Sequence, residues 1–144
     1  MGIHKYIETP EKLWELFLAY KKHVKDNPKI VKDWVGKEAE TVYREKECPL
    51  TMVGFECFVC DNSRITYPDL TNYFDKNNES FKDFVPISSR ILAEIKNDQI
   101  SGGMTMIYSQ NLTARLNGLV DKKETDIKGT LNIPTVPDIG NRKK

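Results

Sequence analysis

Apolar residues recur every three or four positions between residues 13 and 24, which is the spacing of one face of an α-helix. They are Leu13, Phe17, Tyr20 and Val24. Thr9 is a residue type that caps helix N-termini, and Pro10 suits the first helical position. Asn27 and Pro28 close the pattern, because the residue before a proline avoids the helical conformation. The sequence therefore predicts a helix over residues 10–27.

The pattern changes to alternation of apolar and polar residues between residues 29 and 48, which is typical of β-strands. Residues 36–39 separate the two halves and have the composition of a turn. The stretch therefore predicts a two-stranded hairpin in which Trp34 and Tyr43 pair across the strands.

Residues 49–80 have the pattern of two helices joined by a polar turn. Residues 50–59 are a short apolar helix, residues 60–65 are the turn, and Thr66 with Asp69 has the spacing of a capping box. The second helix is expected to reach residue 75 or 76. A helix-turn-helix places its second helix in the major groove of DNA. The side chains that would face DNA are Arg64, Thr66, Thr71, Asn72 and Lys76.

Residues 81–120 predict central helices. A helical turn over residues 81–85 precedes a helix that begins at Pro86. Residues 94–119 read as two helices separated by Gly102 and Gly103, whose lack of a Cβ lets two backbones approach closely. Ser101 is a candidate cap for the second helix, and Asn117 with Gly118 is a typical helix end.

Polar residues share a stripe with apolar ones on this second helix. The stripe contains Met104, Tyr108, Asn111, Leu112, Arg115 and Leu119. It is either the edge of an ordinary amphipathic helix or a subunit interface, in which a neighbouring copy supplies partners for the polar groups. We expect an oligomer interface formed by Met104, Tyr108, Asn111, Leu112 and Arg115.

The last segment, residues 121–144, predicts one strand over residues 125–133 and a basic tail. A single strand needs a mate, which must be another element or the same strand of neighbouring subunits. Arg142, Lys143 and Lys144 end the chain and are either a disordered tail or a contact with DNA.

Charge is nearly balanced over the 144 residues, with a formal net charge of +1. Residues 1–50 carry 10 Lys and Arg against 9 Asp and Glu, residues 51–99 carry 5 against 8, and residues 100–144 carry 7 against 4. The middle segment is therefore unfavourable for binding nucleic acid. On the first helix, Lys21, Lys22 and Lys25 are either a solvated face or contacts with DNA phosphates.

Candidate chemistry is sparse. Cys48, Cys57 and Cys60 are expected to be free thiols, although the last two have the CxxC spacing and a zinc site would need His4 or His23 as well. No motif for phosphate binding and no convincing nucleophile with a base is evident, so we expect neither an enzyme nor a cofactor. No apolar run is long enough to span a membrane, and the N-terminus lacks a signal core, which predicts a cytoplasmic protein.

Three segments resemble the small terminase subunits of tailed double-stranded-DNA bacteriophages. The first is residues 9–14 continuing to Asn27 and Pro28, and the second is residues 49–55. The third matches a central oligomerisation segment of that family and contains Ile95, Asn97, Gln99, Ser101, Gly102, Tyr108, Asn111, Leu112, Arg115, Gly118 and Leu119. Thr66 and Tyr67 match a Thr-aromatic pair in the family's helix-turn-helix. This chain departs from the family in its longer turn and in having Pro68.

The resemblance implies a mainly α-helical protein in three parts. These are a helix-turn-helix head over residues 1–80 with a hairpin over residues 29–48, central oligomerisation helices over residues 81–120, and a C-terminal β-segment with a basic tail over residues 121–144. It implies a homo-oligomeric ring of about eight to eleven subunits, which binds viral DNA and regulates the large terminase subunit. Such a protein acts in the cytoplasm of the infected bacterium and is not expected in the mature virion.

Two other functions fit the same patterns. A dimeric helix-turn-helix transcription regulator would use residues 64–76 and bind a palindromic site. An assembly protein that does not bind DNA would use the same helices only for packing. The oligomeric state separates the first from a packaging ring, and salt-sensitive binding to DNA would count against the second.

Overall fold

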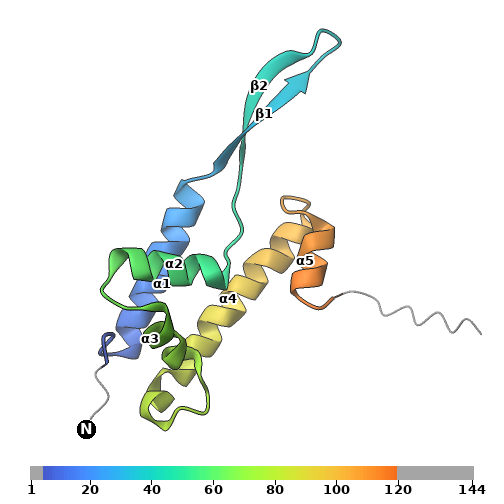
Figure 1. Cartoon of the computed structure of the whole chain (residues 1–144). Coiled ribbons are helices and arrows are strands. Elements are labelled where there is room, and N and C mark those ends of the chain that lie inside the picture. The colour runs from blue at the N-terminus through green and yellow to red at the C-terminus, as the bar shows by residue number, and fades with distance from the viewer. Residues whose placement is uncertain (1–4, 120–144) are drawn as a thin grey trace, which may run out of the picture.

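The computed structural model describes residues 5–119, which form mainly helices and one β-hairpin (Figure 1). In chain order the elements are α1 (Pro10–Asp26), β1 (Lys29–Val35), β2 (Glu40–Lys46), α2 (Met52–Asn62), α3 (Tyr67–Thr71), the 3-10 helices η1 (Asn72–Phe74) and η2 (Glu79–Phe84), α4 (Val85–Met104) and α5 (Gln110–Leu116). The predicted mainly helical class with a small hairpin is confirmed. The predicted C-terminal strand and the tail with Arg142, Lys143 and Lys144 lie outside the described residues.

Helix α1 has the start that the sequence predicts and ends one residue before Asn27. The Thr9 side chain caps it by accepting a hydrogen bond of 3.3 Å from the Lys12 backbone nitrogen. Its buried residues are Leu13, Phe17 and Tyr20. These three have the helical spacing from which the helix was predicted, so α1 is amphipathic and its apolar face forms part of the core.

The core lies between α1, α2 and α4 and is rich in aromatic rings. Phe17 of α1 meets Phe55 of α2 edge to face, with ring centroids 5.5 Å apart. Below them, Tyr73 packs against Phe81 at 4.6 Å and Phe84 at 4.9 Å. Such edge-to-face contacts add stability beyond the apolar area that they bury. The other core residues are Ile7, Leu13, Tyr20, Leu50, Val59, Ile65, Leu70, Ile91 and Ile95.

Two buried tyrosine hydroxyls attach non-helical segments to this core. The Tyr20 hydroxyl donates to the Thr51 carbonyl and accepts from the Thr51 nitrogen, each at 3.0 Å. The Tyr73 hydroxyl accepts from the Ile7 nitrogen at 2.9 Å and donates to the Ile7 carbonyl at 3.4 Å. Both hydroxyls are therefore paired as donor and acceptor, which removes the cost of burying them.

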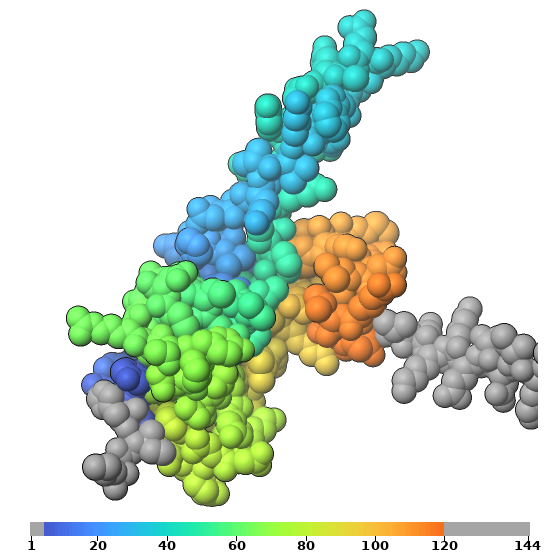
Figure 2. Space-filling view, viewed as in Figure 1, coloured from blue at the N-terminus to red at the C-terminus, as the bar shows by residue number. Residues whose placement is uncertain are grey.

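Strands β1 and β2 form an antiparallel ribbon that projects from the helical body (Figures 1 and 2). We call this ribbon, residues 29–46, the arm. Gly36 and Ala39 take positive φ angles of 79° and 52° in its turn. Trp34 lies opposite Thr41, and Tyr43 lies opposite Lys32. The predicted Trp34–Tyr43 pair is therefore diagonal rather than direct, with both rings on one face of the ribbon.

The segment predicted as a helix-turn-helix differs from the expectation in its boundaries. Helix α2 continues to Asn62, so Cys60 lies inside it rather than in the turn. Helix α3 has only five residues, and a 3-10 helix over residues 72–74 replaces the predicted continuation to residue 75 or 76. The side chains of Thr71 and Asn72 bond to the Pro68 carbonyl. Such bonds compete with the helical backbone, which explains the early end.

The glycine pair does not separate two helices as predicted. Helix α4 passes through Gly102 and Gly103 to Met104, and the chain reverses over residues 105–109 before α5. Ser101 is therefore inside α4, where its hydroxyl donates to the Asn97 carbonyl at 2.7 Å. The expected close approach is present, because both glycines are buried against α5 and the connection before it. Gly118, with φ of 66°, follows the end of α5 as predicted.

Candidate subunit and nucleic-acid interfaces

The lysines predicted to contact DNA from α1 are mostly engaged within the molecule. The Lys21 ammonium lies 3.0 Å from a Glu94 carboxylate oxygen on α4. Lys25 is also paired with α4, through Asp98 at 2.6 Å. Only Lys22 is exposed and forms no ion pair among the described residues. The α1 lysines therefore serve largely to join α1 to α4, and Lys22 alone remains available for a phosphate.

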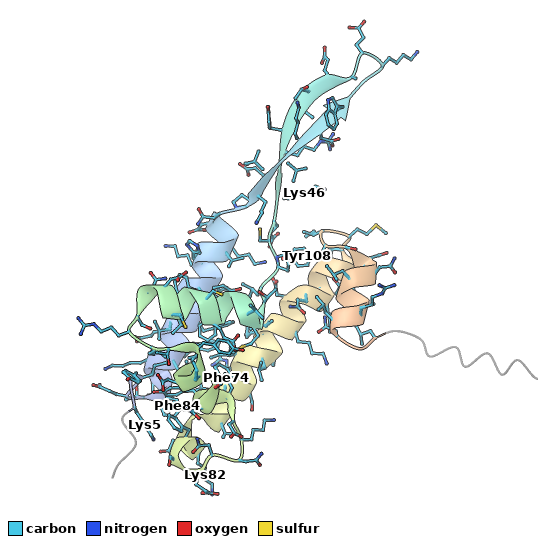
Figure 3. The ribbon with its side chains drawn as sticks, in the orientation of Figure 1. Lys5, Lys46, Phe74, Lys82, Phe84 and Tyr108 are labelled. Atoms are coloured by element: carbon cyan, nitrogen blue, oxygen red, sulfur yellow. The ribbon has the colours of Figure 1, made fainter. Side chains whose placement is uncertain are left out.

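Lys25 is the centre of a polar network at the base of the arm. Its ammonium donates to Glu47 at 2.6 Å and to the Tyr108 hydroxyl at 2.8 Å, in addition to Asp98. Figure 3 shows Tyr108 lying between the α4–α5 connection and the lower end of the arm near Lys46. The network therefore ties together α1, the segment after β2, α4 and the connection to α5.

The titration of this network follows from its geometry. Burial lowers the pKa of Lys25, but the hydrogen bonds that its ammonium donates to Asp98, Glu47 and Tyr108 outweigh that effect and raise the pKa above its usual value. Burial raises the pKa of Tyr108, and the hydrogen bond from Lys25 offsets it only in part. Lys25 is therefore charged and Tyr108 neutral at neutral pH, so the network keeps its hydrogen bonds across the physiological range.

The predicted DNA-facing residues around α3 do not form one surface of free side chains. The Thr66 hydroxyl donates to the Asp69 carboxylate. Thr71 and Asn72 donate to the Pro68 carbonyl at 2.7 Å and 3.2 Å. Arg64 and Lys76 are exposed, without an ion pair among the described residues. Arg64 and Lys76 are thus the free basic groups of this predicted set.

A surface of exposed apolar side chains surrounds α5. We call it the α5 surface, and it consists of Met104, Met106, Ile107, Leu112, Leu116 and Leu119. Met104 and Met106 each expose 78% of their area, and Leu116 exposes 64%. Large apolar side chains that are exposed together in one segment are typical of contacts with another protein. The only charged residue between residues 104 and 119 is Arg115.

Grooves lie along both sides of α5, which meets α4 closely at Gly103. A Cβ at Gly103 would lie 2.8 Å from the Thr113 methyl group, so the two helices are in close contact there. On one side Ile107, Leu112 and Leu116 line a groove of about 300 Å³. On the other side Met104 and Leu119 line a smaller groove of about 200 Å³. The α5 surface therefore consists of a projecting helix with a depression on each side, a shape that suits insertion of side chains from a partner.

Four of the five predicted interface residues are exposed at this surface. They are Met104, Asn111, Leu112 and Arg115. Tyr108 is different, because its hydroxyl belongs to the Lys25 network. Sequence reasoning missed Ile107 and Leu116 as interface residues. The spacing of apolar residues alone does not distinguish a face that packs within the chain from one that remains exposed.

The three cysteines are free thiols, with Cys57 exposed and Cys48 and Cys60 partly buried. Burial raises the pKa of the Cys60 thiol, and the neighbouring Cys57, Asp61 and Glu56 raise it further. Within residues 5–119, no group of three or more His, Cys, Asp or Glu side chains is arranged to hold a metal ion. The CxxC spacing therefore has no additional ligands in the described part of the chain.

Among the described helices, none combines the length and apolar character needed to cross a membrane. Comparison of the chain with protein-family models gave no match, and comparison with curated proteins gave none either.

Proposed function

We propose that this chain is a small terminase subunit of a tailed double-stranded-DNA bacteriophage. In this role it forms a homo-oligomeric ring that binds viral DNA at the start of packaging and regulates the large terminase subunit. The α5 surface is the observation that carries the proposal. It exposes large apolar side chains in the same segment that resembles the family's oligomerisation helices, and such side chains are normally covered by another subunit.

Oligomerisation also explains how a subunit with few free basic groups could bind DNA. One copy offers only a few free basic groups on its body, including Lys22, Arg64 and Lys76, and its net charge is +1. A ring repeats these groups around its circumference. Linked weak contacts then bind with an effective concentration that single copies lack, so a nearly neutral subunit can contribute to useful affinity.

The first test is the native mass of the purified protein by mass spectrometry or light scattering. We expect a ring of about eight to eleven copies. Leu112→Glu and Leu116→Glu place a carboxylate in the α5 surface and should reduce the mass to that of small species. Leu18→Glu is the matched control, because Leu18 is an exposed leucine on α1, outside this surface. A monomeric wild-type protein would contradict the proposal, and a dimer would favour a transcription regulator.

The second test is DNA binding as a function of salt. Arg64→Ala and Lys76→Ala should weaken binding and reduce the slope of log affinity against log salt, because each removes one phosphate contact per subunit. Lys82→Ala is the control, since Lys82 is an exposed lysine whose ion-pair partner in residues 5–119 is Glu79. Unchanged affinity and slope in the first two variants would exclude this head as the DNA contact.

A further inference from the structure

The arm is an unprotected β-ribbon in the described structure. Every residue from 29 to 46 is exposed except Asp33 and Val42, which are half-buried. Trp34 exposes 60% of its area and Tyr43 exposes 70%. The sheet has two strands, so within residues 5–119 each strand has one edge without a hydrogen-bonded neighbour. Such a ribbon is marginally stable alone, and open edges favour pairing with another chain.

Charges on the arm are balanced within each copy at only some positions. Arg44 lies 3.1 Å from Asp33, and the Lys32 ammonium lies 5.5 Å from the centre of the Trp34 ring. By contrast, Lys29 lies directly opposite Lys46, and neither forms an ion pair among the described residues. Opposed like charges destabilise a strand pair. The arm of one copy therefore has both apolar and charged groups that are not fully matched.

We propose that β1 of one arm pairs antiparallel with β2 of the arm of a second copy, displaced by two residues from the register within a copy. This register places Lys32 opposite Glu45, Asp33 opposite Arg44, Trp34 opposite Tyr43, and Val35 opposite Val42. All four pairs are complementary in charge or in apolar character. A displacement of two residues also keeps each side chain on its own face of the sheet.

Other registers are less favourable. Pairing without displacement repeats the opposition of Lys29 and Lys46 between copies and places Val35 against Glu40. Displacement by two residues in the other direction places Asp33 against Glu40, which repel. Of these three registers, the charges of the arm therefore favour displacement by two residues in the proposed direction.

The contact is head-to-tail, because it joins β1 of one copy to β2 of the next. Each arm then keeps one free edge for a further copy, so the contact repeats until the assembly closes into a ring. A displacement of two residues per two-stranded arm is one residue per strand. That is the ratio found in the (β/α)8 barrel, where eight strands have a shear of about eight. The inference rests on the proposed ring and assigns the arms to a closed crown of strands on it.

Cross-linking in the full chain tests this register. Cys48, Cys57 and Cys60 are first changed to Ala, and Lys32→Cys and Glu45→Cys are then introduced into separate copies that are co-expressed. We expect disulfide-linked dimers from the mixture and no dimers above background from either variant alone. Lys32→Cys mixed with Tyr43→Cys is the control for the undisplaced register, and it should give a several-fold lower yield. The three positions that receive a cysteine are exposed, and circular dichroism checks that each variant folds.

Native mass measured on the same samples separates the possible failures. A ring without cross-links in the mixture overturns the arm pairing and leaves the proposed function intact. If cross-links form in the mixture but the native mass is no larger than that of a dimer, the pairing of the arms is supported and the proposed ring is overturned. Dimers from Tyr43→Cys alone indicate two-fold pairing of β2 with β2, which overturns the head-to-tail register.

Discussion

Individual residues decide how closely the elements approach. Gly102 and Gly103 allow the Tyr108 ring and the Thr113 side chain to lie directly against α4. The absence of a Cβ at two successive positions therefore fixes where the α4–α5 connection is folded back. The sequence indicated this close approach correctly. It predicted that the glycines separate two helices, whereas they lie inside α4, because glycine occurs both at helix ends and at helix contacts.

Gly102→Ala is expected to destabilise the protein. A Cβ at this position would overlap the Tyr108 ring, and relief requires movement of a side chain that is held by Lys25. We expect a loss of about 1–3 kcal/mol in the free energy of unfolding, the usual cost of overpacking. Urea denaturation at a fixed protein concentration measures it. Ser101→Ala, one residue earlier and exposed, should change stability by less than about 0.5 kcal/mol. Equal effects of the two changes would contradict the packing role.

Glu56 is expected to make stability depend on pH. Burial raises the pKa of its carboxyl above the ordinary value of 4.5, so the folded state binds the proton more tightly than the unfolded state. The charged form is therefore unfavourable in the folded state, and stability is lost as pH rises through the raised pKa. Glu56→Gln should therefore increase the free energy of unfolding at neutral pH, which urea denaturation measures. The gain should vanish when the pH falls below the ordinary pKa of 4.5, because the carboxyl is then protonated in both states. Glu38 is exposed, so Glu38→Gln should show no such gain.

At the scale of elements, the sequence predicted which helices and strands exist better than it predicted where they begin and end. Helix α1 and the arm have the predicted bounds within a residue or two, because a cap, a proline and a turn mark their ends locally. Helix α3 is shorter than predicted, because the bonds of Thr71 and Asn72 to the Pro68 carbonyl are not visible in periodicity. The Lys25 network was also missed, since its Asp98 partner is 73 positions away and lysine on a helix ordinarily faces solvent.

Lys25→Met tests whether this network holds the elements together. The change keeps much of the side-chain length but leaves Asp98, whose side chain is only 17% exposed, without its cation. We expect a loss of about 1–3 kcal/mol in stability, together with faster amide exchange over residues 47–51 and 105–109. Lys22→Met is the matched control, because Lys22 is exposed on the same helix and has no ion pair in the described structure. Similar exchange in both variants would show that the network is not a structural link.

At the scale of the whole molecule, the body and the arm are separate in their packing. The core residues come from the helices and from residues 7, 50 and 65, and none comes from the arm. The sequence could indicate a hairpin but not its projection, because strand periodicity does not report whether a sheet face is covered. The same limit applies to the α5 surface, because the spacing of apolar residues does not report whether their side chains are covered within the chain.

Removal of the arm should therefore leave the body folded. Replacing residues 31–44 with a short turn of Asn and Gly keeps the base of the ribbon and removes most of its exposed apolar groups. We expect the helical circular dichroism signal to persist and the melting temperature to change by only a few degrees. The oligomer should dissociate at a higher protein concentration than the wild type does, since the crown of strands is lost. Loss of the helical signal would show that the arm is part of the body's stability.

The arm and the body also differ in when they can form. The pairs within the arm join residues that are close in the chain, and hairpins form in about 1–10 μs. The body requires contacts as distant as that between Ile7 and Tyr73, 66 positions apart, and it also requires α4. At a synthesis rate of about 5–20 residues per second, the arm is complete several seconds before α4 leaves the ribosome. Growing chains on one messenger RNA therefore expose their arms before they have bodies. Because such a ribbon is marginally stable alone, we expect it to be stabilised by pairing with the arm of a neighbouring nascent chain, so that assembly begins there.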